Sequence, residues 1–151
     1  MTAVLLSVRP RFARALLDGT KTAEVRRRFP SLPSGTTLYI YSTTPDRAVL
    51  GTVELDTIDR PPVRDVWDKY QDKIEIDQDT LNHYLMDVES PAILCITNPR
   101  PWEQHPSLTA LRDRLGLRPP QSFRYLSEAQ ADVLSRMATG PVGAFCPEAV
   151  G

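Results

Sequence analysis

The sequence predicts an α+β domain built around a small, mostly antiparallel sheet that curls into a barrel-like shape. Short segments of strand character alternate irregularly with helical segments, whereas a regular β-α alternation would favour a parallel, doubly wound sheet. A chain of 151 residues has the size of one domain and can form its own core. We therefore expect a single domain over residues 1–138, with a core at about 3–98, a helical extension at 99–138 and a flexible tail at 139–151.

The first part of the chain contains a strand, a helix and a second extended segment. Residues 4–8 have strand character, and Pro10 suits the first position of a helix because its missing N–H group needs no partner there. The helix is predicted to end near Asp18, since Gly19 readily adopts the left-handed conformation that closes a helix. Residues 22–28 are then predicted to be extended.

Three further strands are predicted from apolar patterns. Residues 37–42 alternate aliphatic and aromatic side chains, and residues 48–55 follow after a turn that contains Pro45, so the two segments are expected to form a hairpin. Residues 92–97 form a continuous apolar run, which is typical of a strand covered on both faces.

Four more helices are predicted from apolar side chains at three- and four-residue spacing. The last of them is preceded by a serine with a glutamine three residues later, the arrangement of a capping box. The helices are predicted to begin at Pro62, at Asp77 or Asp79, at Ser107 and at Ser127.

Charge is distributed unevenly along a chain whose net charge is only −1. Residues 9–28 carry seven basic and two acidic side chains, a net charge of +5, whereas residues 53–90 carry four basic and eleven acidic side chains, a net charge of −7. Two solvated surfaces are one interpretation of this asymmetry. A local basic surface that meets a nucleic acid is the other, and the near-neutral total does not exclude it.

One dense group of opposite charges stands inside the basic segment. Lys21, Glu24 and Arg26 follow Gly19 within eight residues. If the segment is extended, two-residue alternation places Glu24 and Arg26 on the same face, and Lys21 at the turn can join them. Such a group serves either as a site for an anionic ligand or as a structural brace in which Glu24 pairs with Arg26.

The motif Gly19-x-Lys21-x-x-Glu24-x-Arg26, after a strand and a helix and before a strand that follows Gly35, resembles that of the ASCH domain. This family is similar to PUA domains, and the resemblance covers about residues 3–98. It implies a PUA-like small β-barrel with flanking helices and a charged cleft that faces RNA, another single-stranded nucleic acid or a nucleotide. Some ASCH-like proteins cleave RNA and others remove the acetyl group from acetylcytidine, so the resemblance leaves the activity open.

Binding of RNA or a nucleotide in this cleft is the leading hypothesis. Arginines bind phosphate with forked donors, and tyrosine rings can stack on unpaired bases. The alternative for the tyrosines is packing within the sheet. The predicted ligand-binding residues are Arg26, Arg9, Arg28, Tyr39, Tyr41 and Arg124.

Catalysis is the competing hypothesis, with Lys21 and Glu24 as the predicted catalytic residues of a metal-independent ribonuclease or modified-nucleoside amidohydrolase. A partly desolvated lysine beside Arg26 has a lowered pKa and can act as a base or nucleophile, while Glu24 relays protons. The acetylcytidine amidohydrolases that the chain resembles at Lys21 carry threonine in place of Glu24. His83 is a further hypothesis for a general acid or base, and a regulatory module for a small anionic ligand or a partner protein is a third alternative.

Other functional classes receive little support. The two cysteines and two histidines have no ligand spacing, so neither a metal nor another cofactor is expected, and nor is a disulfide. Because no apolar run is long enough for a membrane span or a signal peptide, we expect a cytoplasmic protein without a membrane partner. The oligomeric state stays open. The extension at 99–138 is expected either to cover the core or to place Arg124 and Tyr125 at the mouth of the cleft.

Overall fold

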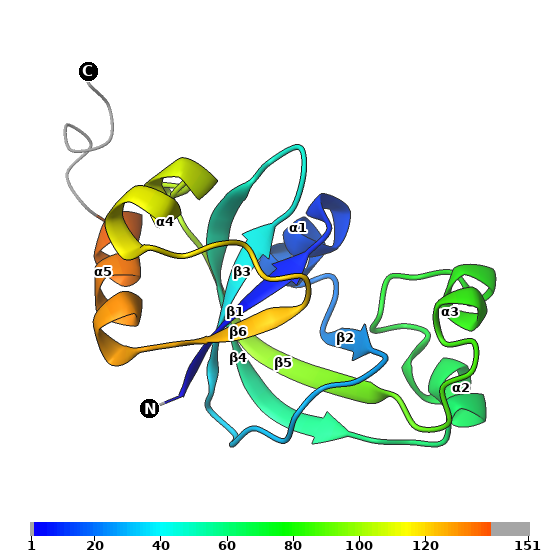
Figure 1. Ribbon diagram of the computed structural model, residues 1–151. Coiled ribbons are helices and arrows are strands. Elements are labelled where there is room, and N and C mark those ends of the chain that lie inside the picture. Colours follow the sequence, from blue (N-terminus) through cyan, green and yellow to red (C-terminus); the bar gives the residue numbers. More distant parts are fainter. Residues whose placement is uncertain (1, 140–151) are drawn as a thin grey trace.

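A computed structural model describes residues 2–139, in which helices surround one curled six-stranded sheet (Figure 1). The predicted flexible tail lies outside these residues, apart from Thr139. In chain order the elements are β1 (Ala3–Val8), α1 (Pro10–Asp18), β2 (Ala23–Arg26), β3 (Thr37–Ser42), β4 (Ala48–Asp59), the 3₁₀ helix η1 (Val63–Asp65), α2 (Val66–Tyr70), α3 (Gln78–Tyr84), β5 (Ala92–Pro101), α4 (Leu108–Leu115), β6 (Phe123–Leu126) and α5 (Glu128–Thr139).

The strands lie in the order β2-β5-β4-β3-β1-β6. The pair β1 and β3 is parallel, with Leu5 opposite Tyr39, and the other pairs are antiparallel. The predicted hairpin of β3 and β4 is present, with a bulge after Ile40. The predicted α+β fold with a curled, mostly antiparallel sheet is therefore confirmed.

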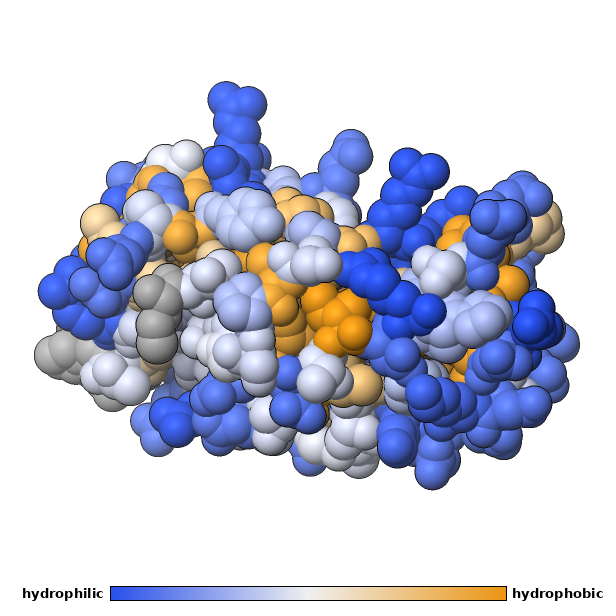
Figure 2. All heavy atoms as spheres, turned by 90° about the horizontal axis from the view of Figure 1, so that it is seen from below, coloured by the Kyte–Doolittle hydropathy of each residue, from blue (hydrophilic) through white to orange (hydrophobic). Residues whose placement is uncertain are grey.

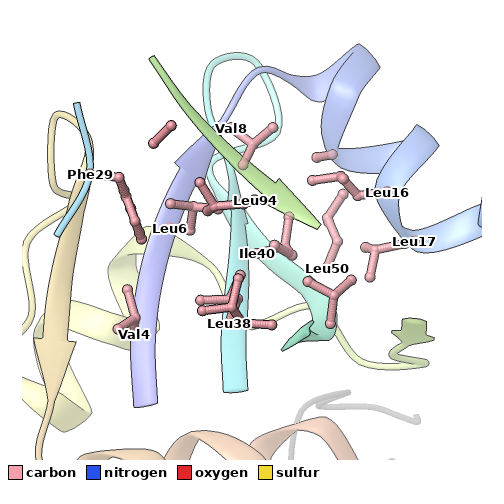
Figure 3. Packing of buried hydrophobic residues seen from close by; sticks show 14 of the residues in the cluster. Val4, Leu6, Val8, Leu16, Leu17, Phe29, Leu38, Ile40, Leu50 and Leu94 are labelled. Atoms are coloured by element: carbon pink, nitrogen blue, oxygen red, sulfur yellow. The ribbon is translucent and has the colours of Figure 1, made fainter. Parts of the chain in front are cut away.

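Apolar side chains fill both faces of the sheet and one end of it. The first cluster packs β1, β3, β4 and β5 against α1, and Figure 3 shows Leu6, Ile40 and Leu94 pointing toward one another there. A second cluster on the opposite face joins β1 and β3 to α4 and α5, and a third joins β2 and β5 to α2 and α3. The helices α4 and α5 of the extension thus cover the core, which was one of the two expectations for residues 99–138.

The helix α1 and its exit have the predicted bounds. Leu16 and Leu17 are buried against the sheet, and Gly19 closes the helix with φ of 87°. Because this left-handed conformation is unfavourable for residues with a Cβ atom, Gly19 fixes the direction in which the chain leaves the helix. Lys21, two residues after Gly19 and two before β2, is fully buried.

The helix caps agree with the sequence as well. Asp77, rather than Asp79, caps α3 by accepting a hydrogen bond from the Thr80 backbone N–H at 2.8 Å. Ser127 and Gln130 form the predicted capping box, with two reciprocal hydrogen bonds of 3.0 Å.

Several strand bounds differ from the prediction. The strand β2 ends at Arg26, because the next two residues bend and Phe29 enters the core. The strands β4 and β5 run to Asp59 and Pro101, since pairing with each other extends both beyond their apolar runs. The strand β6 was not predicted, because it has only four residues and its partner β1 lies more than one hundred residues away along the chain.

One face of the molecule is mostly polar (Figure 2). Figure 2 shows hydrophilic residues over most of the face seen from below, with hydrophobic residues exposed near its centre. Among residues 2–139, no helix has the length and apolar character needed to cross a membrane.

The tight contact between β4, β5 and α1 at Gly51 gives a prediction about stability. A Cβ atom at this position would collide with the Arg100 carbonyl oxygen and would lie 2.9 Å from Leu17 Cδ2. Gly51→Ala is therefore expected to lower the free energy of unfolding by about 1–3 kcal/mol or more, measured by chemical denaturation. Thr52→Ala on the same strand is the control, and a Gly51→Ala protein as stable as this control would contradict the packing.

Candidate functional site

The three charged side chains of the motif, those of Lys21, Glu24 and Arg26, are buried and contact one another. Lys21 has no exposed surface, and Glu24 and Arg26 are each 8% exposed. The Lys21 ammonium lies 3.5 Å from Glu24 Oε1, while Arg26 Nη2 lies 3.0 Å from Glu24 Oε2. The carboxylate is thus held between two cations, and the predicted same-face arrangement of Glu24 and Arg26 is present.

Most N–H donors of Arg26 form hydrogen bonds within the protein. Its Nε donates to Glu24 Oε2 at 3.0 Å, its Nη2 to the Ser7 carbonyl oxygen at 2.8 Å and its Nη1 to Ser122 Oγ at 3.3 Å. A guanidinium has five N–H donors, so little donor capacity remains for a ligand. The charge of Arg26 still reaches the cleft, whereas its geometry is set by β1, β2 and the segment before β6.

Lys21 reaches a fourth part of the chain. Its ammonium donates a hydrogen bond to the carbonyl oxygen of the buried Ile74 and lies 4.9 Å from the centre of the Phe12 ring. Backbone N–H groups of Thr22 and Ala23 also donate to the Lys73 carbonyl oxygen. The segment between α2 and α3 is therefore attached to β2 through Lys21 and its neighbours.

Burial lowers the pKa of Lys21 below its usual 10.5, and the nearby Glu24 carboxylate opposes this shift. Arg26 contributes a smaller lowering effect. The lowered pKa agrees with the sequence prediction, but the cause is mainly burial. The Lys21 ammonium has no exposed surface, and catalysis by Lys21 as a base or nucleophile stays a prediction.

A cleft of about 420 Å³ opens above this network. This volume lies in the range of about 300–1,000 Å³ that is typical of ligand-binding pockets. The cleft lies between the C-terminal end of β1, the start of α1, β2 and α3. Its lining includes Arg9, Phe12, Glu24, Val25, Arg26, Thr43, Ile76, Thr80, His83, Tyr84 and Gln121, together with Ser7 and Val8.

A larger hollow, of about 590 Å³, lies on the other flank of α1. Its floor is apolar, with Leu17 and Leu50, and two of its charges already form the Arg14–Asp46 ion pair at 2.8 Å. No residue of the Lys21, Glu24 and Arg26 group lines it. We therefore place the candidate site in the smaller cleft, where the charged group and several polar side chains meet.

The predicted arginines lie in different places. Arg9 is exposed and lines the cleft beside Arg26. Arg28 is exposed but does not line the cleft, and Arg124 is exposed on β6 with its Nη1 donating to the Arg118 carbonyl oxygen at 3.4 Å. Only Arg9 therefore joins the motif, and ligand binding by Arg28 and Arg124 stays a prediction.

Tyr39 and Tyr41 are buried on the opposite face of the sheet, in the cluster that α4 and α5 cover. The Tyr39 hydroxyl is hydrogen-bonded to Ser135 Oγ at 2.8 Å, and its ring meets Trp102 edge-on. Neither tyrosine lines the cleft. Their placement corresponds to the packing interpretation, and their part in ligand binding stays a prediction.

Sequence reasoning missed the aromatic side chains that do line the cleft. Phe12 lines the cleft and is partly exposed at the start of α1. Tyr84 is 38% exposed near the end of α3, and His83 beside it also lines the cleft, as the weaker hypothesis for this residue required. The sequence offered no local signal for this placement, because Phe12 lies six residues, nearly two helical turns, before the end of α1.

The acidic segment does not neutralise the cleft. Its helix α3 borders the cleft through Thr80, His83 and Tyr84, and the carboxylate among the lining residues is that of Glu24. Arg27 attaches this helix to the basic segment by donating to the Tyr84 and Met86 carbonyl oxygens at 2.8 and 3.2 Å. The cleft therefore combines two arginines and a histidine with one carboxylate, which suits an anionic ligand.

Residues 2–139 contain no group of three His, Cys, Asp or Glu side chains placed to hold a metal ion. The polar groups that line the cleft include the Glu24 carboxylate, the His83 imidazole and the guanidinium groups of Arg9 and Arg26. This set can bind a phosphate, accept a proton and donate one.

The lowered pKa of Lys21 gives a prediction about pH dependence. Between the folded-state pKa and 10.5, the unfolded chain binds more protons than the folded chain, so this group makes stability rise with pH in that interval. Lys21→Met lacks the titrating group but keeps the Glu24–Arg26 pair. The free energy of unfolding of the wild type, relative to this variant, is therefore expected to increase with pH toward 10.5 in denaturation series, and parallel curves would contradict the burial of a charged Lys21.

Comparison with known proteins relates this fold to one family. The family described as "Domain of unknown function (DUF365)" matches residues 1–112. An ASCH domain-containing ribonuclease of Zymomonas mobilis is 28% identical over 131 residues, which cover 86% of this chain and 88% of that protein.

Solved structures lead to the same assignment. The crystal structure of ASCH from Zymomonas mobilis has a TM-score of 0.85 and 26% identity, covering 89% of this chain and 94% of that chain. Human THYN1, solved in complex with 5-methylcytosine containing DNA, shares the fold alone, with a TM-score of 0.59 and 12% identity over 93% of this chain and all of that chain. The chain belongs to the DUF365 family, and both its sequence relative and its PUA-like fold identify it as an ASCH domain.

Proposed function

We propose that this chain binds RNA in the cleft above Glu24 and Arg26 and cleaves it there. The observation that carries the proposal is the joint placement of phosphate-binding arginines, aromatic rings and acid-base groups in one cleft. The Zymomonas mobilis relative, which carries the name ribonuclease and matches most of the chain, supports the cleavage step.

Binding is assigned to Arg9 and to the exposed aromatic rings. Arg9 is the cleft arginine whose donors are free of the ion-pair network, so it is the stronger phosphate ligand, and Arg26 adds its charge from below. Phe12 and Tyr84 can stack on unpaired bases, which contributes about 1–3 kcal/mol per base. Because a base must be unstacked to use such rings, single-stranded RNA is the expected form of the substrate.

Cleavage is assigned to Glu24 and His83. RNA can be cleaved when its 2′-hydroxyl oxygen attacks the adjacent phosphorus, so that the new P–O bond forms as the bond to the 5′ oxygen breaks. A base must take the proton of the 2′-hydroxyl, and an acid must supply a proton to the leaving oxygen. Glu24 and His83 are the two cleft groups that can share these roles, and the guanidinium groups stabilise the charge that develops on the phosphate.

Lys21 has a positioning role in this proposal. Its ammonium has no exposed surface, so it does not contact a substrate directly. It holds Glu24 from below and ties the segment before α3 to the floor of the cleft. For the same reason, amide hydrolysis with Lys21 as the nucleophile is not the function that this geometry favours.

The binding step predicts a specific loss of affinity. Arg9→Ala is expected to weaken binding of single-stranded RNA and to reduce the slope of log K against log salt concentration by about 0.7, because one phosphate contact is lost. Fluorescence anisotropy with labelled oligonucleotides at several salt concentrations measures both quantities. Arg64→Ala, at a side chain that is 82% exposed on η1, is the control with the same loss of charge. Equal affinities of the two variants would rule out Arg9 as a ligand-binding residue.

The cleavage step predicts a loss of rate without a loss of binding. His83→Gln is expected to lower the rate of RNA cleavage by about 10²–10⁴-fold, the usual contribution of a general acid or base, while the affinity for RNA stays near that of the wild type. Gel assays of labelled RNA measure the rate, and Asn82→Ala, an exposed neighbour, serves as the control. Absence of cleavage by the wild type would remove the enzymatic part of the proposal and leave binding to be judged by the Arg9 variant.

A further inference from the structure

Four exposed arginines that do not line the cleft are here called the arginine patch: Arg47 in the turn between β3 and β4, Arg112 in α4, Arg118 in the segment after α4, and Arg124 in β6. Arg112 and Arg118 line one hollow of about 430 Å³ together with Gly116 and Leu117. Arg124 joins them, since its Nη1 donates to the Arg118 carbonyl oxygen at 3.4 Å. Arg112 and Arg118 therefore border one concave surface, and Arg124 is attached beside it.

Arg47 extends the patch from the turn between β3 and β4. Burial raises the pKa of the Tyr41 hydroxyl, and both Arg47 and Arg112 act against this shift through their charges. The backbone joins the same two elements, because the Leu108 N–H at the start of α4 donates to the Arg47 carbonyl oxygen at 2.9 Å. Tyr41, buried for most of its surface, marks the point at which the turn and α4 meet.

The patch is not neutralised by ion pairs. Within residues 2–139, the ion pairs use Arg14, Lys21, Arg26, Arg64 and Lys69, and none includes an arginine of the patch. No carboxylate lines the hollow that Arg112 and Arg118 share. Four like charges without partners are unfavourable for stability, so an anionic ligand would relieve their repulsion.

Two segments connect the patch to the cleft. Thr43, at the start of the turn that carries Arg47, lines the cleft, and so does Gln121, between Arg118 and Arg124. This second segment is attached to the cleft floor, because Ser7 Oγ donates to the Pro120 carbonyl oxygen at 2.6 Å. Figure 1 shows the chain leaving α4, crossing the sheet and turning back into β6. A strand of nucleic acid that leaves the cleft over either segment would meet the patch next.

We propose that the arginine patch is a second binding surface, which holds the phosphate backbone of single-stranded RNA as it leaves the cleft. The inference rests on the proposed function for the identity of the polymer. Forked guanidinium donors match phosphate oxygens, and a concave row of arginines follows a flexible backbone without reading its bases. The cleft then selects and cleaves a nucleotide, while the patch adds affinity for longer chains.

The experiment compares short and long RNA. The triple variant Arg112→Ala, Arg118→Ala, Arg124→Ala is expected to bind an oligonucleotide of about 16 nucleotides roughly 100-fold more weakly near 0.1 M salt, with a salt slope smaller by about 2, since about three phosphate contacts are lost. Its affinity for an oligonucleotide of about 4 nucleotides, which occupies only the cleft, is expected to remain unchanged. Anisotropy titrations measure both, and circular dichroism checks the fold.

The control removes the same charge elsewhere. Arg64→Ala, Arg100→Ala, Arg136→Ala changes three exposed arginines, none of which lines the cleft or the hollow of the patch. If both triple variants lose the same affinity for long RNA, or if neither loses any, the patch is not a binding surface. If the patch variant loses affinity for long RNA while Arg9→Ala loses none, the patch is a binding surface and the assignment of binding to the cleft is wrong. A wild type that binds no RNA of either length overturns both.

Discussion

The ion network of Lys21, Glu24 and Arg26 is the interaction on which the rest of this structure depends. It joins parts of the chain that the sheet order keeps apart: β2 lies at one edge, and β1 lies four places away. Arg26 bridges them by donating to the Ser7 carbonyl oxygen, and Lys21 adds the segment before α3. Removing one member of such a buried group costs about 3–5 kcal/mol, because the remaining charges lose their compensation.

The structural role of this ion network is therefore compatible with its position at the cleft. The network joins β2 to β1 through Arg26 and to the segment before α3 through Lys21. The cleft lies between these same parts of the chain. Glu24 shows why, since one carboxylate both receives two cations from the protein and lines the cleft. A ligand that competes for the donors of Arg26 would have to displace structural contacts to Glu24, Ser7 and Ser122.

Sequence alone predicted the elements that local signals define. Pro10 and Gly19 marked both ends of α1, and the period-two pattern of β2 placed Glu24 beside Arg26. The burial of Lys21 could not be predicted, because it arises from Ile74 and Phe12, which the fold brings together from distant positions. The strand β6 could not be predicted for the same reason, since pairing with a distant strand leaves no periodic pattern in four residues.

The position of Lys21 also bears on what this family signature encodes. A lysine that met phosphate directly would need exposed donors, whereas this ammonium is surrounded by a carboxylate, a carbonyl oxygen and an aromatic ring. Its partners supply the attraction that offsets part of the desolvation that burial imposes. The geometry explains the spacing of the motif. Gly19 ends α1 in a left-handed conformation, and Lys21 two residues later is buried. Glu24 and Arg26 lie on the same face of β2 and line the cleft. The cleft is lined by Glu24 and Arg26 from the motif and by Arg9, Phe12, His83 and Tyr84 from outside it, which the fold gathers around the motif.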